Sequence, residues 1–226
     1  MAYSHSGSGA AKRYISLDVE CVATGKRHDD RDVCFVAVVD DDEKVLLKKK
    51  VKPEKRIVSY LTPLTGFRAG DLDDGEKLSD VIADVKHILG PDVVLIGQNV
   101  QSDIKWLHLQ EGTDFGGKVE LSVMFRAYNR RYGNDSTFSL QHEANTLLHA
   151  GFISDQHDPA TDAIASVKLF NKFYGKPDLI EQAKQRLLST RVQPSFAKRN
   201  DFRWEGVCMA AFRPDRCFCG APTLKT

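Results

Sequence analysis

The sequence lacks any unbroken apolar run of about 20 residues, the length that a transmembrane helix needs. Its first 14 residues, MAYSHSGSGAAKRY, lack the apolar core of a signal peptide, so we expect neither a membrane span nor a secretory leader. The sequence also lacks an excess of charge of either sign, because 32 Lys and Arg stand against 31 Asp and Glu. This balance excludes bulk electrostatic attraction to nucleic acid, but it leaves room for a local basic face.

Cysteine is scarce and odd in number, with five residues in the chain. Cys21 and Cys34 lie in apolar, strand-like runs, which does not suit a disulfide framework. We therefore expect a reducing, intracellular location, either cytoplasmic or nuclear. Protein partners stay unknown at this stage.

The order of the expected elements indicates a mixed α/β fold. Apolar and β-branched runs predict strands over residues 13–22, 32–40, 44–52 and 92–97. Apolar residues at helical spacing predict helices over residues 78–90, 101–112, 137–149 and 178–189, and a long helix that starts within HDPATDAIASVKLF, residues 157–170. Three meander strands followed by strands interleaved with helices favour a mixed sheet. We expect a flexible lead (1–11), one main domain (12–190) and a basic, Cys-containing extension (191–226).

Four carboxylates stand out by position. Asp18 and Glu20 are two residues apart on the first strand, so they project from the same face of an otherwise apolar run. Two buried like charges are costly unless a cation neutralises them, and oxygen ligands suit Mg²⁺ or Mn²⁺. Asp103 follows the apolar strand 92–97, at the edge where open α/β sheets place their sites. Asp162 falls in the first turn of the helix that Asp158 caps.

Each of these residues also has a simple structural explanation. Asp103 and Asp162 fit equally well as first-turn acids that the helix dipole stabilises. His157 alone is typical of a loop or capping residue. However, His157 precedes Asp162 by five positions, and its ordinary pKa of about 6.5 suits it to take a proton from water near neutral pH.

Three segments carry a resemblance. SLDVECVATG, LIGQNVQSDIKWL and HDPATDAIASVKLF resemble, in this order, the three motifs of the DEDDh family of 3′–5′ exonucleases. With YLTPLTGF at residues 60–67, the chain is most similar to the RNA exonuclease branch that contains the interferon-stimulated exonuclease and the yeast rRNA-processing exonucleases. The resemblance covers roughly residues 12–175, and three ordered motifs make it specific. The spacing from His157 to Asp162 is that of the histidine subclass; the tyrosine subclass would have Tyr where this chain has Asp158.

The resemblance implies a ribonuclease-H-like fold, a five-stranded mixed sheet flanked by helices. It implies two Mg²⁺ or Mn²⁺ ions, a general base at His157, and metal ligands at Asp18, Glu20, Asp103 and Asp162. It also places seven residues beside the terminal nucleotide: Cys21, Val22, Ala23, Thr65, Gly66, Phe67 and Asn99. Cys21 stands where this branch usually has Met.

Two basic segments allow more than one interpretation. Residues 44–56, KVLLKKKVKPEKR, carry seven Lys or Arg, which favours a charged edge strand over a nuclear-import signal. Residues 125–133, FRAYNRRYG, interleave arginines with aromatic residues, a pattern equally typical of a nucleic-acid contact and of a solvated surface helix or loop.

The end of the chain, CFCGAPTLKT, resembles the opening of a GRF-type zinc finger whose remaining ligands would lie beyond residue 226. Cys217 and Cys219 cannot close a four-ligand site, and Cys208 adds a third thiolate. No histidine follows residue 157, so we expect no complete zinc site within this chain.

The predicted function is hydrolysis of single-stranded RNA from the 3′ end to nucleoside 5′-monophosphates. The partners are then single-stranded 3′ ends, with RNA favoured over DNA, and no membrane. Two alternatives remain open: the same chemistry on DNA ends, or a nucleic-acid-binding module without catalysis.

Overall fold

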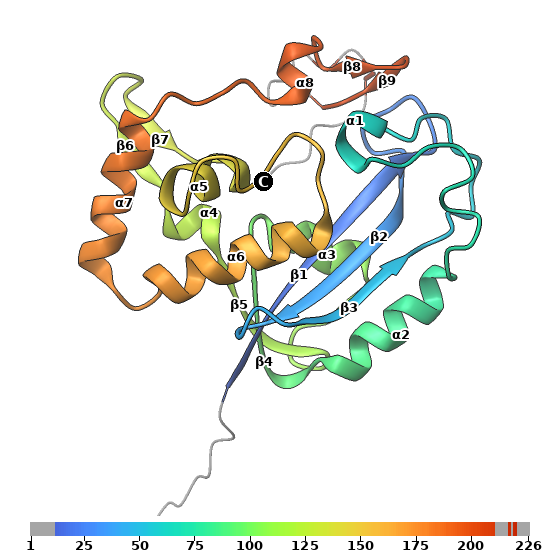
Figure 1. Cartoon of the computed structure of the whole chain (residues 1–226), viewed down its shortest axis with the longest axis horizontal. Coiled ribbons are helices and arrows are strands. Elements are labelled where there is room, and N and C mark those ends of the chain that lie inside the picture. The colour runs from blue at the N-terminus through green and yellow to red at the C-terminus, as the bar shows by residue number, and fades with distance from the viewer. Residues whose placement is uncertain (1–11, 211–216, 218, 221–226) are drawn as a thin grey trace, which may run out of the picture.

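A computed structural model describes residues 12–210, 217, 219 and 220 of the chain (Figure 1). The lead predicted over residues 1–11 lies outside the described residues. A five-stranded sheet has the order β3-β2-β1-β4-β5. Its strands are β1 (Arg13–Ala23), β2 (Arg31–Asp40), β3 (Val45–Lys50), β4 (Gly90–Gly97) and β5 (Phe115–Glu120). β2 is antiparallel to β1 and β3, whereas β4 is parallel to β1 and β5, so the sheet is mixed as predicted.

Helices cover both faces of the sheet (Figure 1). α2 (Leu78–Ile88) and α3 (Val100–Trp106) pack on one face, and the long α6 (Pro159–Phe173) crosses the other. α5 (Leu140–Leu147) and α7 (Pro177–Ser189) pack against α6. The short helices are α1 (Thr62–Thr65), α4 (Leu121–Met124) and α8 (Phe196–Arg199). Two small hairpins complete the fold: β6 (Ala127–Asn129) with β7 (Asn134–Ser136), and β8 (Arg203–Trp204) with β9 (Val207–Cys208).

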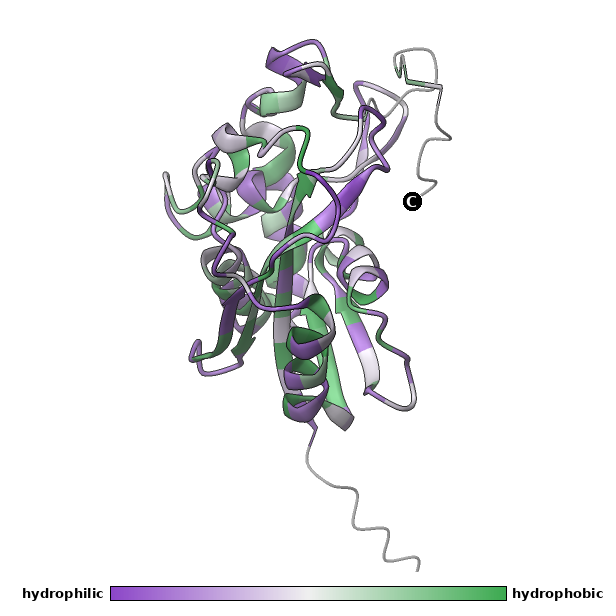
Figure 2. Ribbon diagram, turned by 90° about the vertical axis from the view of Figure 1, so that its right-hand side faces the viewer, coloured by the Kyte–Doolittle hydropathy of each residue, from purple (hydrophilic) through white to green (hydrophobic). Residues whose placement is uncertain are grey.

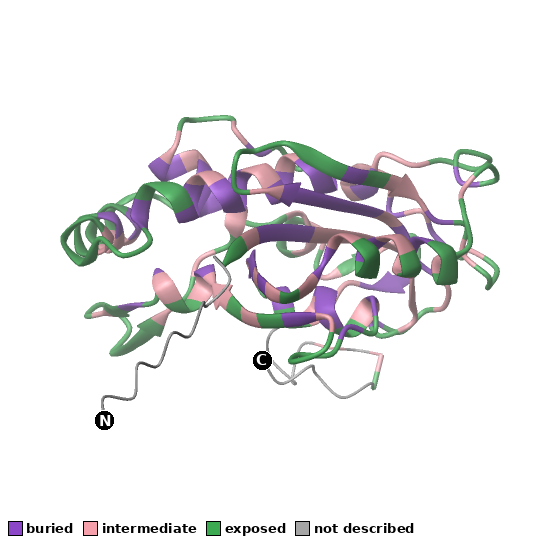
Figure 3. Cartoon of the chain, turned by 90° about the horizontal axis from the view of Figure 1, so that it is seen from below, coloured by how far each residue is buried: buried purple, intermediate pink, exposed green. Residues whose placement is uncertain are grey.

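The core lies between the sheet and its helices. Hydrophobic colouring follows the central strands in Figure 2, and Figure 3 shows the same strands as mainly buried, with exposed positions on loops and outer helix faces. α6 comes close to the sheet because a small residue faces it: Ala163 is fully buried and packs with Val39 of β2. Among the described residues, none of the helices is long and apolar enough to cross a bilayer.

Most predicted elements form within a few residues of the predicted bounds. The lysine-rich strand is an edge strand, as expected, and its Lys48, Lys49 and Lys50 each form ion pairs with acidic side chains. One prediction needs correcting, because the helix predicted over 101–112 ends at Trp106. Residues 125–133 form turns and the first strand of the β6–β7 hairpin rather than a helix, and the alternative of a nucleic-acid contact there stays a prediction.

Candidate active site

The alternation of β1 separates its acids from its apolar residues. Ile15 and Leu17 are buried in the core that contains α2 and α3. Asp18 and Glu20 therefore project from the opposite face, which α6 covers. The pairing with β2 shifts register between Glu20 and Cys21, and such irregularities often lie next to active sites because they re-aim side chains.

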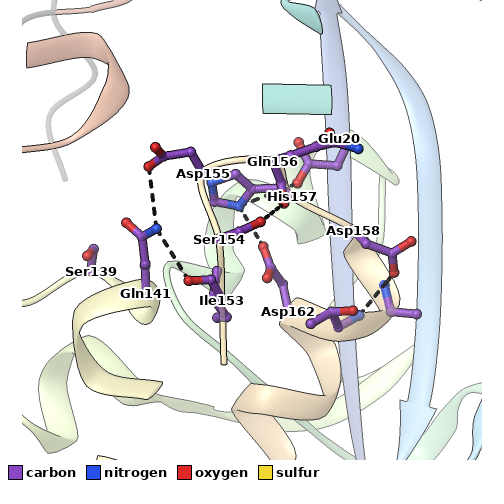
Figure 4. Close-up of polar contacts among 12 residues, drawn as sticks. Glu20, Ser139, Gln141, Ile153, Ser154, Asp155, Gln156, His157, Asp158 and Asp162 are labelled. Atoms are coloured by element: carbon purple, nitrogen blue, oxygen red, sulfur yellow. Dashed lines mark hydrogen bonds and ion pairs between the residues drawn. The ribbon is translucent and has the colours of Figure 1, made fainter. Parts of the chain in front are cut away.

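The start of α6 brings His157 and Asp162 close to Glu20 (Figure 4). Asp158 caps the helix by accepting hydrogen bonds from the N–H groups of Ala160 and Thr161 at 3.0 and 3.1 Å. One turn later the Asp162 carboxylate is buried, and its Oδ2 lies 2.7 Å from Nδ1 of His157. The same Nδ1 lies 3.9 Å from Oε1 of Glu20. Residues that are far apart in the sequence therefore meet at one point.

Asp103 reaches the site from the first turn of α3, and its side chain is buried. Glu120 at the end of β5 fixes the start of this helix, because its carboxylate accepts the N–H groups of Asn99 and Val100 at 2.7 and 3.0 Å. Burial raises the pKa of the Asp103 carboxyl, and hydrogen bonds from the backbone N–H groups of Asp103 and of Val19 on β1 act against this rise. α3 packs against β1.

The acids are crowded enough to resist ionising together. Burial raises the pKa of Asp18 well above its usual value, and the charges of Asp103, Glu20 and Asp162 raise it further. Burial also raises the pKa of Asp103 well above its usual value, against the hydrogen bonds that lower it. The pKa of Glu20 rises to about 7, again mainly through burial. The charges of Asp103, Glu20 and Asp162 therefore all act on the Asp18 carboxyl.

His157 is the positive partner of this cluster. Burial acts to lower its pKa, but the hydrogen bond and charge of Asp162, together with Glu20, outweigh burial and raise it to about 9. In this arrangement the imidazole is therefore protonated at neutral pH. Its backbone N–H donates to the carbonyl of Leu64 at 2.6 Å, which ties the His157 loop to α1.

The donor set fits divalent cations. Oδ1 of Asp162 is buried and has no hydrogen-bond partner among the described residues, so it is left without a ligand to neutralise it. One donor atom each from Glu20, His157 and Asp162 lies within 4.8 Å of the others. Carboxylate oxygens are the ligands that Mg²⁺ and Mn²⁺ prefer.

The three residues after Glu20 differ in side-chain exposure and in how far their backbone groups are already hydrogen-bonded. Cys21 is partly exposed, and burial with the neighbouring Cys34 raises the pKa of its thiol. Val22 is fully buried beside Leu72, so its side chain cannot contact a nucleotide. The backbone of Ala23 is already engaged, because its N–H donates to Ser59 and its carbonyl accepts from Val58 and Ser59. The nucleotide contacts at Cys21, Val22 and Ala23 stay predictions.

The loop after α1 lies against the His157 loop. The Thr65 hydroxyl donates to the Tyr60 carbonyl and accepts the Phe67 N–H, so this side chain shapes the turn. Gly66 has φ 75°, and a Cβ there would lie 2.5 Å from the side chain of Gln156, next to His157. The Phe67 ring packs edge-on against Phe35 at 5.4 Å.

Asn99 lies across the site at the start of α3. Its φ of 57° is left-handed, its side chain is exposed, and its amide donates to the Ser102 hydroxyl. It is therefore free to turn toward a ligand at the edge of the sheet.

Sequence reasoning missed two residues that shape the site. Glu120 was missed because β5, in FGGKVE, has two glycines and lacks the apolar run of a buried strand. Lys48 lies on the edge strand, yet its ammonium contacts the Asp158 carboxylate at 2.6 Å and lies 5.4 Å from the Phe35 ring. The only signal in the sequence is the alternation along the strand, which places the Lys48 side chain on the opposite face from Leu47.

A polar cavity of about 470 Å³ lies beside the His157 loop. Its lining includes Asp155, Gln141, Arg191 and Arg199. The guanidinium of Arg199 contacts the Asp155 carboxylate at 2.6 Å, so the chain beyond α7 forms one wall of this cavity.

Comparison with known proteins then assigns the family. Residues 15–170 match the sequence profile described as Exonuclease, RNase_T. The chain belongs to this exonuclease family. The family consists of nuclease hydrolases, and the match confirms the exonuclease relationship that the three motifs predicted.

Curated relatives agree with this assignment. RNA exonuclease 4 of Xenopus tropicalis is 33% identical over 158 residues, which are 70% of this chain and 37% of that protein. RNA exonuclease 1 of Saccharomyces cerevisiae is 29% identical over 136 residues, 59% of this chain and 23% of that protein. The chain thus spans well under half the length of these two relatives.

Solved structures confirm the fold. The Saccharomyces cerevisiae Pan2 pseudoubiquitin hydrolase-RNA exonuclease module, solved with AAGGAA RNA, covers 81% of this exonuclease chain with a TM-score of 0.64 and 17% identity. The match spans 32% of the Pan2 chain. At this identity the likeness concerns the fold, which is ribonuclease-H-like as predicted.

Proposed function

We propose that this chain is a metal-dependent 3′–5′ exonuclease that hydrolyses single-stranded RNA to nucleoside 5′-monophosphates. The observation that carries the proposal is the cluster of Glu20, His157 and Asp162, whose donor atoms lie within 4.8 Å of one another. Asp18 is supported as a member of the same group because burial, and then the charges of Asp103, Glu20 and Asp162, raise the pKa of its carboxyl, so several ionised acids here would repel one another. Divalent cations would relieve this repulsion.

Asp18, Glu20, Asp103 and Asp162 would hold two Mg²⁺ or Mn²⁺ ions. Bound there, such ions would stabilise the charge that develops on the scissile phosphate. His157 would take the proton of the attacking water. The carboxylates that raise its pKa to about 9 are the proposed ligands, so ligation removes the cause of that shift and returns the imidazole toward a base.

RNA as substrate is supported by the names of the relatives. Curated relatives include RNA exonucleases and Small RNA degrading nuclease 2 of Arabidopsis thaliana, and a Pan2 module was solved with A7 RNA. The backbone and side chains near Cys21, Gly66, Phe67 and Asn99 would surround the 3′-terminal nucleotide. Arg191 and Arg199 in the polar cavity would receive the strand behind it.

A second basic contact is proposed at the β6–β7 hairpin. Tyr128 and Tyr132 are 60% and 66% exposed, and the Arg131 guanidinium lies 5.6 Å from the Tyr132 ring. Exposed aromatic rings beside arginines suit base stacking. All five cysteines are free thiols, and we propose an intracellular location, cytoplasmic or nuclear.

The proposal is tested with 5′-labelled single-stranded RNA and DNA of the same sequence, incubated with Mg²⁺ or Mn²⁺. We expect a ladder that shortens from the 3′ end, release of nucleoside 5′-monophosphates, and faster loss of RNA. Asp18→Asn, which keeps the shape of the side chain, should give no ladder. Faster loss of DNA would favour an exodeoxyribonuclease, and tight binding without hydrolysis would favour a binding module.

A further inference from the structure

A second cluster of metal-ligating side chains lies outside the acidic site. Its members are Cys208 on β9, Cys217, Cys219, and His28 from the turn between β1 and β2. Nδ1 of His28 lies 3.1 Å from the sulfur of Cys217 and 3.1 Å from that of Cys219. The Cys217 sulfur lies 3.4 Å from that of Cys208 and 3.3 Å from that of Cys219. All four donor atoms lie within 4.8 Å of one another.

This cluster corrects an expectation from the sequence. No histidine follows residue 157, which led us to expect an incomplete ligand set. The fold instead supplies His28 from 180 residues upstream of Cys208, and nothing in the spacing of the cysteines indicates it.

The spacing fits a tetrahedral metal site. Zn–S bonds of about 2.3 Å and a Zn–N bond of about 2.05 Å place neighbouring sulfurs about 3.8 Å apart and a nitrogen about 3.6 Å from each sulfur. The observed separations of 3.1–3.4 Å lie within about half an ångström of these values. A disulfide would bring two sulfurs to about 2.05 Å.

The parts that carry the ligands are already held together. The N–H of Cys208 donates to the carbonyl of Lys26 at 2.8 Å, and the Arg31 guanidinium donates to the carbonyl of Cys208 at 2.7 Å. His28 and Cys208 are 6% and 7% exposed, so these two ligands are shielded from water, whereas Cys217 and Cys219 are partly exposed. Three thiolates and a neutral imidazole around Zn²⁺ carry a net charge of −1, which the adjacent Arg31 balances.

We propose that His28, Cys208, Cys217 and Cys219 bind one structural Zn²⁺ ion, which fastens the C-terminal extension to the β1–β2 turn. Four protein ligands leave no open position, so the site stabilises structure rather than activating water. The extension then packs Val207 against Ala23 and Leu61. This contact lies next to α1, whose Leu64 carbonyl accepts the His157 N–H.

The test is the zinc content of the full chain, purified without chelator and exchanged into excess Mg²⁺, by plasma mass spectrometry. We expect about one zinc per chain, and less than about a tenth of that in Cys217→Ser/Cys219→Ser. Two controls should keep their zinc: Cys34→Ala, a buried cysteine outside the cluster, and Asp18→Asn, in the acidic site. Zinc lost from Asp18→Asn, or kept by the double serine variant, would overturn the proposal.

A cobalt-substituted protein gives a readout on the folded chain. Tetrahedral Co²⁺ with three thiolates should show visible d–d bands and a sulfur-to-metal charge-transfer band, whose intensity falls by about a third in Cys219→Ser. His28→Gln should keep the charge-transfer band and shift the d–d bands. Absence of these bands in the unaltered chain, with a mass lower by two hydrogens that reductant restores, would show a disulfide and refute the zinc site. None of these readouts depends on nuclease activity.

Discussion

At the scale of single residues, the central feature is the pairing of His157 with Asp162. Their separation of 2.7 Å orients the imidazole, and the buried carboxylate stabilises its charged form. The sequence predicted this pair because the five-residue spacing across a helix start belongs to a recognisable motif. It could not predict the tie between the His157 N–H and Leu64, because that contact joins loops about 90 residues apart.

Replacing His157 by glutamine tests its role as a base. The amide keeps a polar side chain but cannot take a proton, so kcat should fall by about 10²–10⁴-fold. The variant should still bind Mn²⁺, as measured by the rise in Tm, because the four acids remain. Activity within a few-fold of the unaltered enzyme would contradict the assigned role.

Glu143 predicts a pH dependence of stability outside the acidic cluster. This residue of α5 is fully buried, its Oε2 has no hydrogen-bond partner among the described residues, and burial raises its pKa well above the usual 4.5. The folded state then binds the proton more tightly than the unfolded state, so stability falls as pH rises above about 4.5.

Glu143→Gln should remove this loss of stability at higher pH, because glutamine carries no proton to release. We expect the variant to match the unaltered chain near pH 4 and to exceed it in free energy of unfolding at pH 7–8, as measured by urea titrations at both pH values. An equal difference at the two pH values would show that Glu143 does not titrate in this range.

At the scale of elements, the site depends on how β5 and α3 meet. The sequence predicted β1 and β4 from their apolar runs, but it missed β5, which FGGKVE hides. Gly116 of β5 lies so close to the neighbouring strand that a Cβ there would be 2.1 Å from the Pro91 carbonyl oxygen. This close approach therefore requires glycine. Strand prediction relies on the hydrophobicity of side chains, so it cannot detect a strand whose glycine is required because it has no side chain.

Glu120→Ala tests this junction. It leaves the N–H groups of Asn99 and Val100 without their acceptor, which should cost about 1–3 kcal/mol of stability and lower activity by displacing Asp103. Glu111→Ala is a matched control, since it removes only an exposed ion pair with Lys118 and should cost no more than about 1 kcal/mol. Equal effects on chemical denaturation of the two variants would argue against a positioning role for Glu120.

At the scale of the whole molecule, the acidic site joins three segments: β1, the start of α3 and the start of α6 (Figure 1). Each motif was visible in the sequence, and the order of elements indicated a mixed sheet, whereas its five strands were implied only by the family resemblance. The His28 cluster was not visible, because local spacing carries no information on contacts between residues about 180 to 190 positions apart. Contacts of this kind depend on the complete fold.

Cation binding should therefore stabilise the whole chain. A hundredfold excess of Mg²⁺ over its Kd contributes about 2.7 kcal/mol, or roughly 5–10 °C in Tm for a chain of this size. Asp18→Asn should abolish this rise, and it should increase the Tm of the metal-free protein because it removes one of the crowded charges. Thermal unfolding with and without Mg²⁺ measures both effects. A full Mg²⁺-dependent rise in the variant would place the cation elsewhere.

The most direct measurement is anomalous diffraction from crystals grown with Mn²⁺. We predict two peaks about 3.5–4 Å apart, bridged by Asp18, with Glu20, Asp103 and Asp162 completing the ligand set, and neither peak in Asp18→Asn crystals. Crystals that show the four carboxylates without manganese at saturating concentration, or manganese bound only elsewhere, would contradict the account.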